Sequence, residues 1–204
     1  LHFSSVPPQV PSMPSGAAQL GMDAFGVEQN GNDLKELDAY LTRYCQIHRL
    51  KHRRESFSKT IHGHGIPAVQ YELFESKEAF VSKKATTVSF FRGDTSLTGE
   101  LFRRHPCDLL VTDLPYGIQH APGEAGGMTS FKGFLARVLP EWHTALRPGG
   151  ALSLSMNVLT LRKEDALRLL REHGFEPLTA PPYDDFLHDV EQAVRRDFIV
   201  ALRL

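Results

Sequence analysis

Residues 111–117 read Val-Thr-Asp-Leu-Pro-Tyr-Gly and continue an apolar run that begins at Cys107. A short apolar run that ends in a charge and a proline is typical of a buried parallel strand. We therefore expect Asp113 at the carboxyl end of a strand, where open α/β sheets bind ligands. Pro115 cannot continue the strand ladder. One rigid turn would then carry the Asp113 carboxylate, the Pro115 carbonyl and the Tyr116 ring. Together these groups can do specific chemistry on an exocyclic amino group.

Two stretches upstream repeat the pattern of a strand that ends in an acid. Residues 24–30 predict a short strand with Glu28 near its end, and residues 87–94 predict a strand that ends at Asp94. Turn and cap residues follow the first strand and predict a helix to about Leu50. Strands that alternate with helices predict an α/β fold with a parallel sheet and helices on its faces. A carboxylate at a strand end can accept both ribose hydroxyl hydrogens of a nucleoside cofactor.

The rest of the chain continues this alternation. We expect a short helix from Thr95 towards Arg104, a helix from about Phe131 that residues 146–150 stop, and a helix over residues 162–173. Strands are expected over residues 151–156, 175–178 and 197–202. Pro140 should kink the first of the two long helices or start a second segment. The glycine-rich residues 117–130 are typical of a lid or a binding loop.

Two segments carry weaker patterns. Residues 1–16 contain four prolines and predict an irregular or incomplete amino-terminal part. Residues 55–86 are polar and mixed, which indicates an insertion, with a possible strand over residues 66–74. We predict a single domain over residues 1–204.

The densest basic cluster is His-Arg-Leu-Lys-His-Arg-Arg at residues 48–54. It is either a phosphate-contacting patch or the solvated end of the preceding helix, where cations favour the helix dipole. His48 and His52 have the spacing of a metal clamp on a helix, with His62 and His64 nearby. No further ligand has convincing spacing, so we predict no metal site.

Composition narrows the class of protein. The 204 residues carry a formal net charge of −1, with 41% hydrophobic and 23% charged residues, as in an ordinary globular domain. There is no global basic field, so nucleic acid would have to bind at local patches. The 2 cysteines form no spaced cluster, which favours a reduced setting. No signal peptide or membrane-spanning run is apparent, so we expect a cytoplasmic protein that does not enter a membrane.

The ordered motifs resemble those of class I S-adenosylmethionine-dependent methyltransferases that methylate base amino nitrogens. Asp113-Leu114-Pro115-Tyr116 is similar to their catalytic (D/N/S)-(P/L)-P-(Y/F) motif. Glu28 resembles the acid that holds the cofactor ribose, and Asp94 resembles the acid that receives the adenine amino group. Leu-Arg-Pro-Gly-Gly at residues 146–150 resembles the turn before the fifth strand. The string at residues 111–120, with the basic helix end, is most similar to the THUMP-associated tRNA guanosine-N2 methyltransferase group and its bacterial relatives.

The resemblance implies a Rossmann-like, seven-stranded sheet, mostly parallel with a reversed C-terminal strand, and helices on both faces. It implies S-adenosyl-L-methionine as cofactor and a flipped-out base that lies against the Tyr116 ring. Asp113 and the carbonyl of Leu114 or Pro115 would each accept one N–H hydrogen bond from the base amine. This arrangement aims the nitrogen lone pair at the cofactor methyl, so Asp113 belongs to both the catalytic and the cofactor set.

The chain departs from the family at one place. The glycine-rich loop D-P-x-x-G-x-G, which holds the methionine moiety of the cofactor, has no counterpart before Ala24. Ala17 to Gly21 would be the last turn of the helix that follows that loop, and Gly16 is a candidate remnant of it. Either upstream residues are missing from this sequence or the cofactor site is degenerate.

The leading hypothesis is methylation of guanosine N2 in tRNA or rRNA. The same tetrapeptide serves DNA adenine-N6 and cytosine-N4 methyltransferases and protein glutamine methylation. A DNA methyltransferase would be expected to carry a target-recognition segment, and only residues 55–86 and 117–130 are available for one. This favours RNA as the substrate. No RNA-binding domain such as THUMP is visible, so a partner subunit is a possible source of RNA binding. A degenerate fold that acts as a non-catalytic partner is the remaining alternative.

Overall fold

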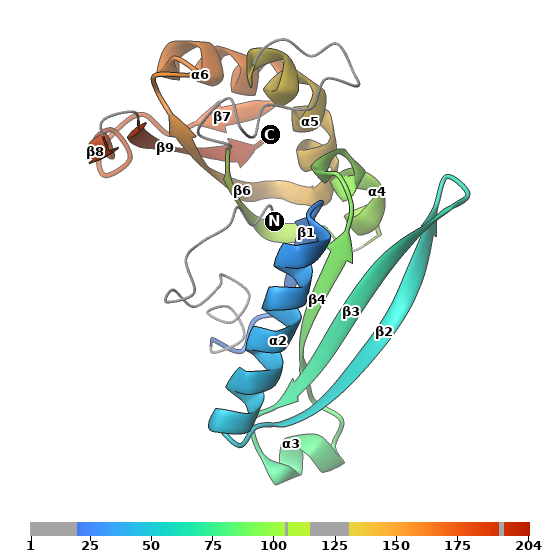
Figure 1. Cartoon of the computed structure of the whole chain (residues 1–204). Coiled ribbons are helices and arrows are strands. Elements are labelled where there is room, and N and C mark those ends of the chain that lie inside the picture. The colour runs from blue at the N-terminus through green and yellow to red at the C-terminus, as the bar shows by residue number, and fades with distance from the viewer. Residues whose placement is uncertain (1–19, 105, 115–130, 192–193) are drawn as a thin grey trace. The chain divides into compact units, whose positions relative to one another are not determined.

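The computed structural model describes residues 20–104, 106–114, 131–191 and 194–204. The chain divides into two compact units, Leu1–Thr95 (unit 1) and Ser96–Leu204 (unit 2). Figure 1 shows both units, with elements labelled where there is room. Gly16, Pro115, Tyr116 and the predicted loop 117–130 lie outside the described residues, as does the predicted irregular segment 1–16.

Unit 1 is built on a four-stranded sheet in the order β1-β4-β3-β2. Its strands are β1 (Ala24–Glu28), β2 (Lys51–Ile61), β3 (His64–Phe74) and β4 (Thr86–Arg92). β1 pairs in parallel with β4, whereas β3 pairs antiparallel with both β4 and β2. The predicted strands at 24–30, 66–74 and 87–94 are therefore confirmed, with Glu28 as the last residue of β1. β2 was not predicted.

Helix α2 (Gly31–Ile47) lies along one face of this sheet (Figure 1). The Asn30 side chain caps it by accepting the N–H of Asn32 at 3.0 Å. Leu41 and Cys45 are buried against residues such as Val88 and Phe90 of β4. A short helix, α3 (Lys77–Val81), follows β3 and is capped by Ser76.

The basic cluster at residues 48–54 spans the end of α2 and the start of β2. The helix ends at Ile47, before the predicted Leu50, and Arg49 has a left-handed φ of 52° that leaves the helical path. Lys51 already pairs with Phe74 in the hairpin. The interpretation of the whole cluster as a solvated helix end is therefore wrong. His48 and His52 also fall in different elements, so they do not form a helical clamp.

The β2–β3 hairpin pairs without interruption from Lys51 and Phe74 to Ile61 and His64. The two residues between the strands, His62 and Gly63, both have positive φ, at 49° and 81°. Two-residue turns with positive φ at both positions match the right-handed twist of the flanking strands. The turn therefore sets the register of a hairpin whose first strand is too polar to be predicted from apolar alternation.

Unit 2 is built on a five-stranded sheet in the order β5-β6-β9-β7, with β8 also paired to β9. Its strands are β5 (Cys107–Asp113), β6 (Leu146–Asn157), β7 (Phe175–Pro177), β8 (His188–Glu191) and β9 (Val194–Arg203). β5 runs parallel to β6, and β9 runs antiparallel to β6, which confirms the predicted reversed C-terminal strand. β6 already includes residues 146–150, so the prediction that they form the turn before this strand is wrong. β8 was not predicted.

The described pairings correct the prediction of a mostly parallel sheet. Only β1–β4 and β5–β6 are parallel among the strands that the structure describes, and the other pairings are antiparallel. The β2–β3 hairpin and the C-terminal strands β7, β8 and β9 account for the difference. The result is an α/β fold with mixed sheets, in which one strand of each parallel pair ends in a predicted acid, β1 at Glu28 and β5 at Asp113. β4 ends at Arg92, two residues before the predicted Asp94.

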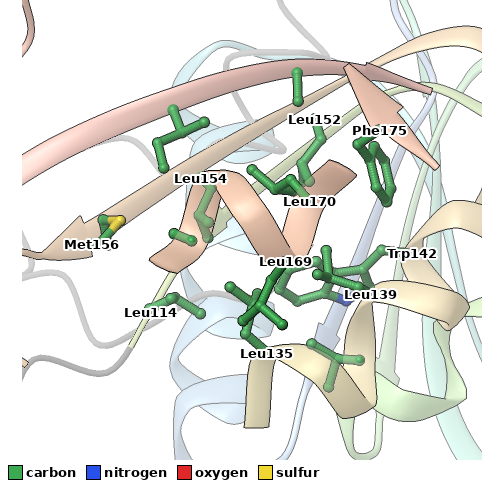
Figure 2. Close-up of a cluster of buried hydrophobic side chains, with 14 of the residues drawn as sticks. Leu114, Leu135, Leu139, Trp142, Leu152, Leu154, Met156, Leu169, Leu170 and Phe175 are labelled. Carbon is green, nitrogen blue, oxygen red and sulfur yellow. The ribbon is translucent and has the colours of Figure 1, made fainter. Parts of the chain in front are cut away.

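The core of unit 2 forms where α5 (Phe131–Ala145) and α6 (Lys163–Glu172) pack together and against the sheet. Figure 2 shows Trp142 and Leu139 from α5 with Leu169 and Leu170 from α6, close to Leu152 of β6. Helix α5 continues through Pro140, so no second segment starts there. A shorter helix, α4 (Thr98–Phe102), follows a 3₁₀ turn at Thr95–Leu97 and packs against α5.

Candidate cofactor and amine sites

Glu28 is a buried carboxylate at the carboxyl end of β1. It is 5% exposed, and its Oε1 accepts the backbone N–H of Asn30 at 2.7 Å. Its Oε2 is also buried and has no hydrogen-bond partner among the described residues. Burial raises the pKa of Glu28, although the Asn30 N–H acts in the opposite direction. A buried acceptor without a partner costs free energy, so this oxygen is suited to a ligand that donates a hydrogen bond.

Asp94 follows the strand next to Glu28. Glu28 is paired in parallel register with Arg92, the last residue of β4. The N–H of Gly93 donates to the Glu28 carbonyl at 3.0 Å, which holds the chain beside β1 just before Asp94. Asp94 is partly buried. The structure therefore brings Glu28 and Asp94 to the same carboxyl edge of one parallel pair, as the sequence predicted for two ligand-binding acids.

Asp113 is the last residue of β5 and is paired with Ser155 of β6. The next residue, Leu114, donates its N–H to the Ser155 carbonyl at 2.9 Å. Its side chain is 2% exposed and belongs to the core of unit 2, as Figure 2 shows. This anchor fixes the backbone beside the Asp113 side chain, which is itself partly buried. Pro115, Tyr116 and Gly16 lie outside the described residues, so the roles predicted for them at the amine and cofactor sites stay predictions.

Sequence reasoning predicted the Asn30 cap but missed its contact with Glu28 and the other residues around the start of α2. Asn30 is both the helix cap and the donor to Glu28. Arg92 directly precedes Gly93-Asp94, and its guanidinium atoms lie 3.1–3.3 Å from the position that a Cβ would occupy at Gly31. The helical spacing of Gly31, Lys35 and Asp38 would have placed these residues on one face of α2.

Neither a metal site nor a membrane span occurs in the described part of the chain. Within residues 20–104, 106–114, 131–191 and 194–204, no three His, Cys, Asp or Glu side chains lie together as a metal site would require. None of the helices described there has both the length and the apolar character needed to cross a bilayer.

Known methyltransferase structures are distantly similar to this chain. No protein-family model matches the chain, and no curated protein matches its sequence. A methyltransferase homologue from Pyrococcus horikoshii is 14% identical, with a TM-score of 0.48 over 88% of this chain and 53% of that chain. TrmN from Thermus thermophilus is 15% identical, with a TM-score of 0.41 over 94% of this chain and 48% of that chain.

A proposed DNA modification methylase from Thermus thermophilus, crystallised with S-adenosyl-L-methionine, is also similar. It is 21% identical, with a TM-score of 0.30 over 52% of this chain and 50% of that chain. The chain thus spans about half the length of each of these structures. At such low identity and TM-score the likeness assigns no residue and no substrate, so the functional argument rests on the side chains described above.

Proposed function

We propose that this chain is a methyltransferase unit that uses S-adenosyl-L-methionine and acts on an exocyclic amino nitrogen of a nucleic-acid base. Guanosine N2 in tRNA or rRNA is the proposed target. The observation that carries the proposal is the half-satisfied Glu28 carboxylate, with one oxygen on the Asn30 N–H and the other buried without a described partner. It stands beside the strand that leads to Asp94.

The residues at this edge fit the nucleoside part of the cofactor. A ribose diol presents two hydroxyl donors, and the Glu28 carboxylate has an acceptor that needs one. A ligand hydroxyl there would offset the cost of burying Oε2. Asp94 supplies a second carboxylate on the neighbouring strand end, suited to the amino group of adenine. The cofactor, when bound, supplies an electrophilic methyl group on a sulfonium.

Asp113 has the chemistry to bind and orient the accepting amine. The lone pair of an exocyclic base amine is delocalised into the ring, so the amine is a weak nucleophile. A carboxylate that accepts one N–H hydrogen bond, together with a backbone carbonyl that accepts the other, favours a tetrahedral nitrogen. Asp113 need not be a strong base, because the amine loses its proton after it has become cationic. The anchored backbone at Leu114 supports this role because it limits the movement of the strand end.

The hairpin supports a nucleic-acid substrate. Four cationic side chains lie on the mostly exposed strand β2, at Lys51, Arg53, Arg54 and Lys59. Two of them are already paired, Arg53 with Glu72 and Arg54 with Asp38. Local cationic strands of this kind are what a chain with a net charge of −1 needs to bind a polyanion. We also propose that β2, β3 and α3 are an insertion within a single methyltransferase domain, as the polar composition of residues 55–86 suggested.

Two measurements on the same preparation test the proposal. Calorimetric titration with S-adenosyl-L-methionine should show binding, and the Glu28→Gln variant should bind at least about tenfold more weakly because a carboxylate acceptor is lost. Asp23→Asn, an exposed acid just before β1, is the matched control and should bind normally.

Methyl transfer from labelled cofactor into tRNA, rRNA and DNA, followed by nucleoside analysis, identifies the target. Label in N2-methylguanosine of RNA supports the full proposal, and label in methylated DNA bases would replace its substrate part. Absence of cofactor binding by the intact protein would instead favour the non-catalytic partner.

A further inference from the structure

A second feature of unit 1 is a cleft of about 510 Å³ between α2 and the sheet, here called the α2 cleft. Its apolar floor is formed by Leu34 of α2, Val69 of β3 and Phe90 of β4. The start of α2 and the exposed Ser56 of β2 form its rim. A volume of this size is within the range of pockets that hold small organic ligands. None of the acids assigned to the cofactor or the amine lines it.

Two cations stand on the wall of the α2 cleft. Lys35 lies one turn into α2, and Arg92 lies at the end of β4 with its guanidinium close to Gly31. Among the residues that the structure describes, neither side chain forms an ion pair. Exposed cations without carboxylate partners favour an anionic ligand.

Asp38, the one acid among the described residues that line the cleft, is already neutralised. Asp38 accepts two hydrogen bonds from Arg54, at 2.9 and 2.7 Å, and one from the Tyr71 hydroxyl. The hydrogen bond from Arg54 is the main reason that the pKa of Asp38 is lowered. Thr42 adds a hydrogen bond to the same hydroxyl at 2.7 Å. The cleft therefore has a cationic part at Lys35 and Arg92 and a closed, charge-balanced part at Asp38.

We propose that the α2 cleft binds one nucleotide of the RNA that the enzyme modifies, away from the base that is methylated. The phosphate pairs with Lys35 and Arg92, and the base lies against the apolar floor formed by Leu34, Val69 and Phe90. This inference rests on the proposed function, since it assumes a nucleic-acid substrate.

The test compares RNA binding by matched charge variants. The probe is a fluorescein-labelled single-stranded RNA of about ten nucleotides, followed by anisotropy over a range of salt concentrations. Lys35→Ala combined with Arg92→Ala should weaken binding about tenfold or more. It should also lower the slope of log affinity against log salt by about 1.4, the value for two lost phosphate contacts.

Lys77→Ala combined with Lys84→Ala is the control, because these exposed cations belong to unit 1 but do not line the cleft. It removes the same charge and should change affinity by no more than about twofold. A third variant, Ser56→Phe, fills the cleft from its rim without changing the charge and should also lose about tenfold in affinity. Circular dichroism of each variant verifies that it is folded.

Each result decides for or against the α2 cleft. Equal losses in the two charge pairs, or normal RNA binding by Ser56→Phe and by the cleft pair, would overturn the proposal. Loss of cofactor binding with normal RNA binding would also overturn it, because the cleft would then hold the cofactor. If the unaltered protein binds no S-adenosyl-L-methionine while the cleft variants still lose RNA, the proposed function fails and the RNA site stands.

Discussion

Unit 1 and unit 2 hold their elements together by different means. The buried cluster of unit 2 joins α5, α6 and the sheet through large apolar side chains such as Trp142, Leu139 and Phe175. The described apolar cluster of unit 1 is smaller, and a polar cluster of Asp38, Thr42, Arg54 and Tyr71 adds to it. Large buried apolar side chains thus hold the described core of unit 2, whereas a charge-assisted polar cluster lies beside the smaller apolar cluster of unit 1.

The candidate acids of the two units differ in how they are held in the absence of a ligand. Asp113 is followed by Leu114, which belongs to the apolar core, so its position is fixed without any ligand. Glu28 is buried with an oxygen that has no described partner, so unit 1 has a cost that a bound ligand can remove. A ligand that binds only the folded state adds stability by mass action. We therefore expect cofactor binding to stabilise unit 1 more than unit 2.

The largest expected effect is on the core of unit 2. Trp142 is 1% exposed, so Trp142→Ala should lower the free energy of unfolding by about 3–5 kcal/mol through lost contacts and a residual cavity. Denaturant titration measures the loss, and hydrogen exchange should rise first in the amides of β6. Trp142→Phe is the control and should cost less. Faster exchange confined to β4 would contradict the assignment of this core to unit 2.

Removal of the Asp113 carboxylate should affect chemistry and not folding. Asp113→Ala should lower kcat about 10²- to 10³-fold, the usual cost of losing one group that stabilises the transition state. Cofactor affinity should change little. Asp108→Ala on the same strand is the control, because Asp108 is exposed and pairs with Arg147 at the surface. Unchanged turnover in Asp113→Ala would exclude the proposed role.

An intermediate effect is expected in the polar cluster of unit 1. Asp38→Asn keeps an acceptor but loses the charged pair with Arg54, which should cost about 1–2 kcal/mol because both side chains are partly exposed. The pKa of Asp38 is lowered from its ordinary value of 3.8, so its contribution is present above that value and is lost as the pH falls through the lowered pKa. Acid titration of the unfolding free energy should show this loss in the unaltered protein and not in Asp38→Asn.

The smallest effect is expected at Glu28 and has the opposite sign. Because burial raises its pKa above the ordinary value of 4.5, stability is greatest below that value and decreases as the pH rises through the raised pKa. Glu28→Gln removes this ionisation, so its melting temperature at neutral pH should equal or slightly exceed that of the unaltered protein. Thermal melts across pH measure the effect, and added cofactor should reverse the ranking. If Glu28→Gln were clearly less stable than the unaltered protein at neutral pH, the ionised Glu28 carboxylate would have to be stabilised by hydrogen-bond partners, which would contradict this prediction.

Local patterns were sufficient to predict the elements that carry the candidate acids. The apolar runs before Glu28, Asp94 and Asp113 predicted β1, β4 and β5, since a charge or a proline ends a strand wherever the strand packs. The Asn30 cap similarly predicted the start of α2. β2 could not be predicted in the same way. Its residues are mostly charged or polar, and only the pairing with β3 holds them extended.

The sequence by itself determined the order of the strand-end acids and the type of the elements around them, because caps, turns and apolar periodicity act over a few neighbouring residues. Only the tertiary structure decided that Glu28 keeps a buried oxygen without a described partner, and that Lys35 and Arg92 line one cleft. Burial and hydrogen-bond satisfaction depend on residues distant in the chain. Lys35 and Arg92 are separated by 57 positions, and the packing of α2 on β4 brings them to the same wall.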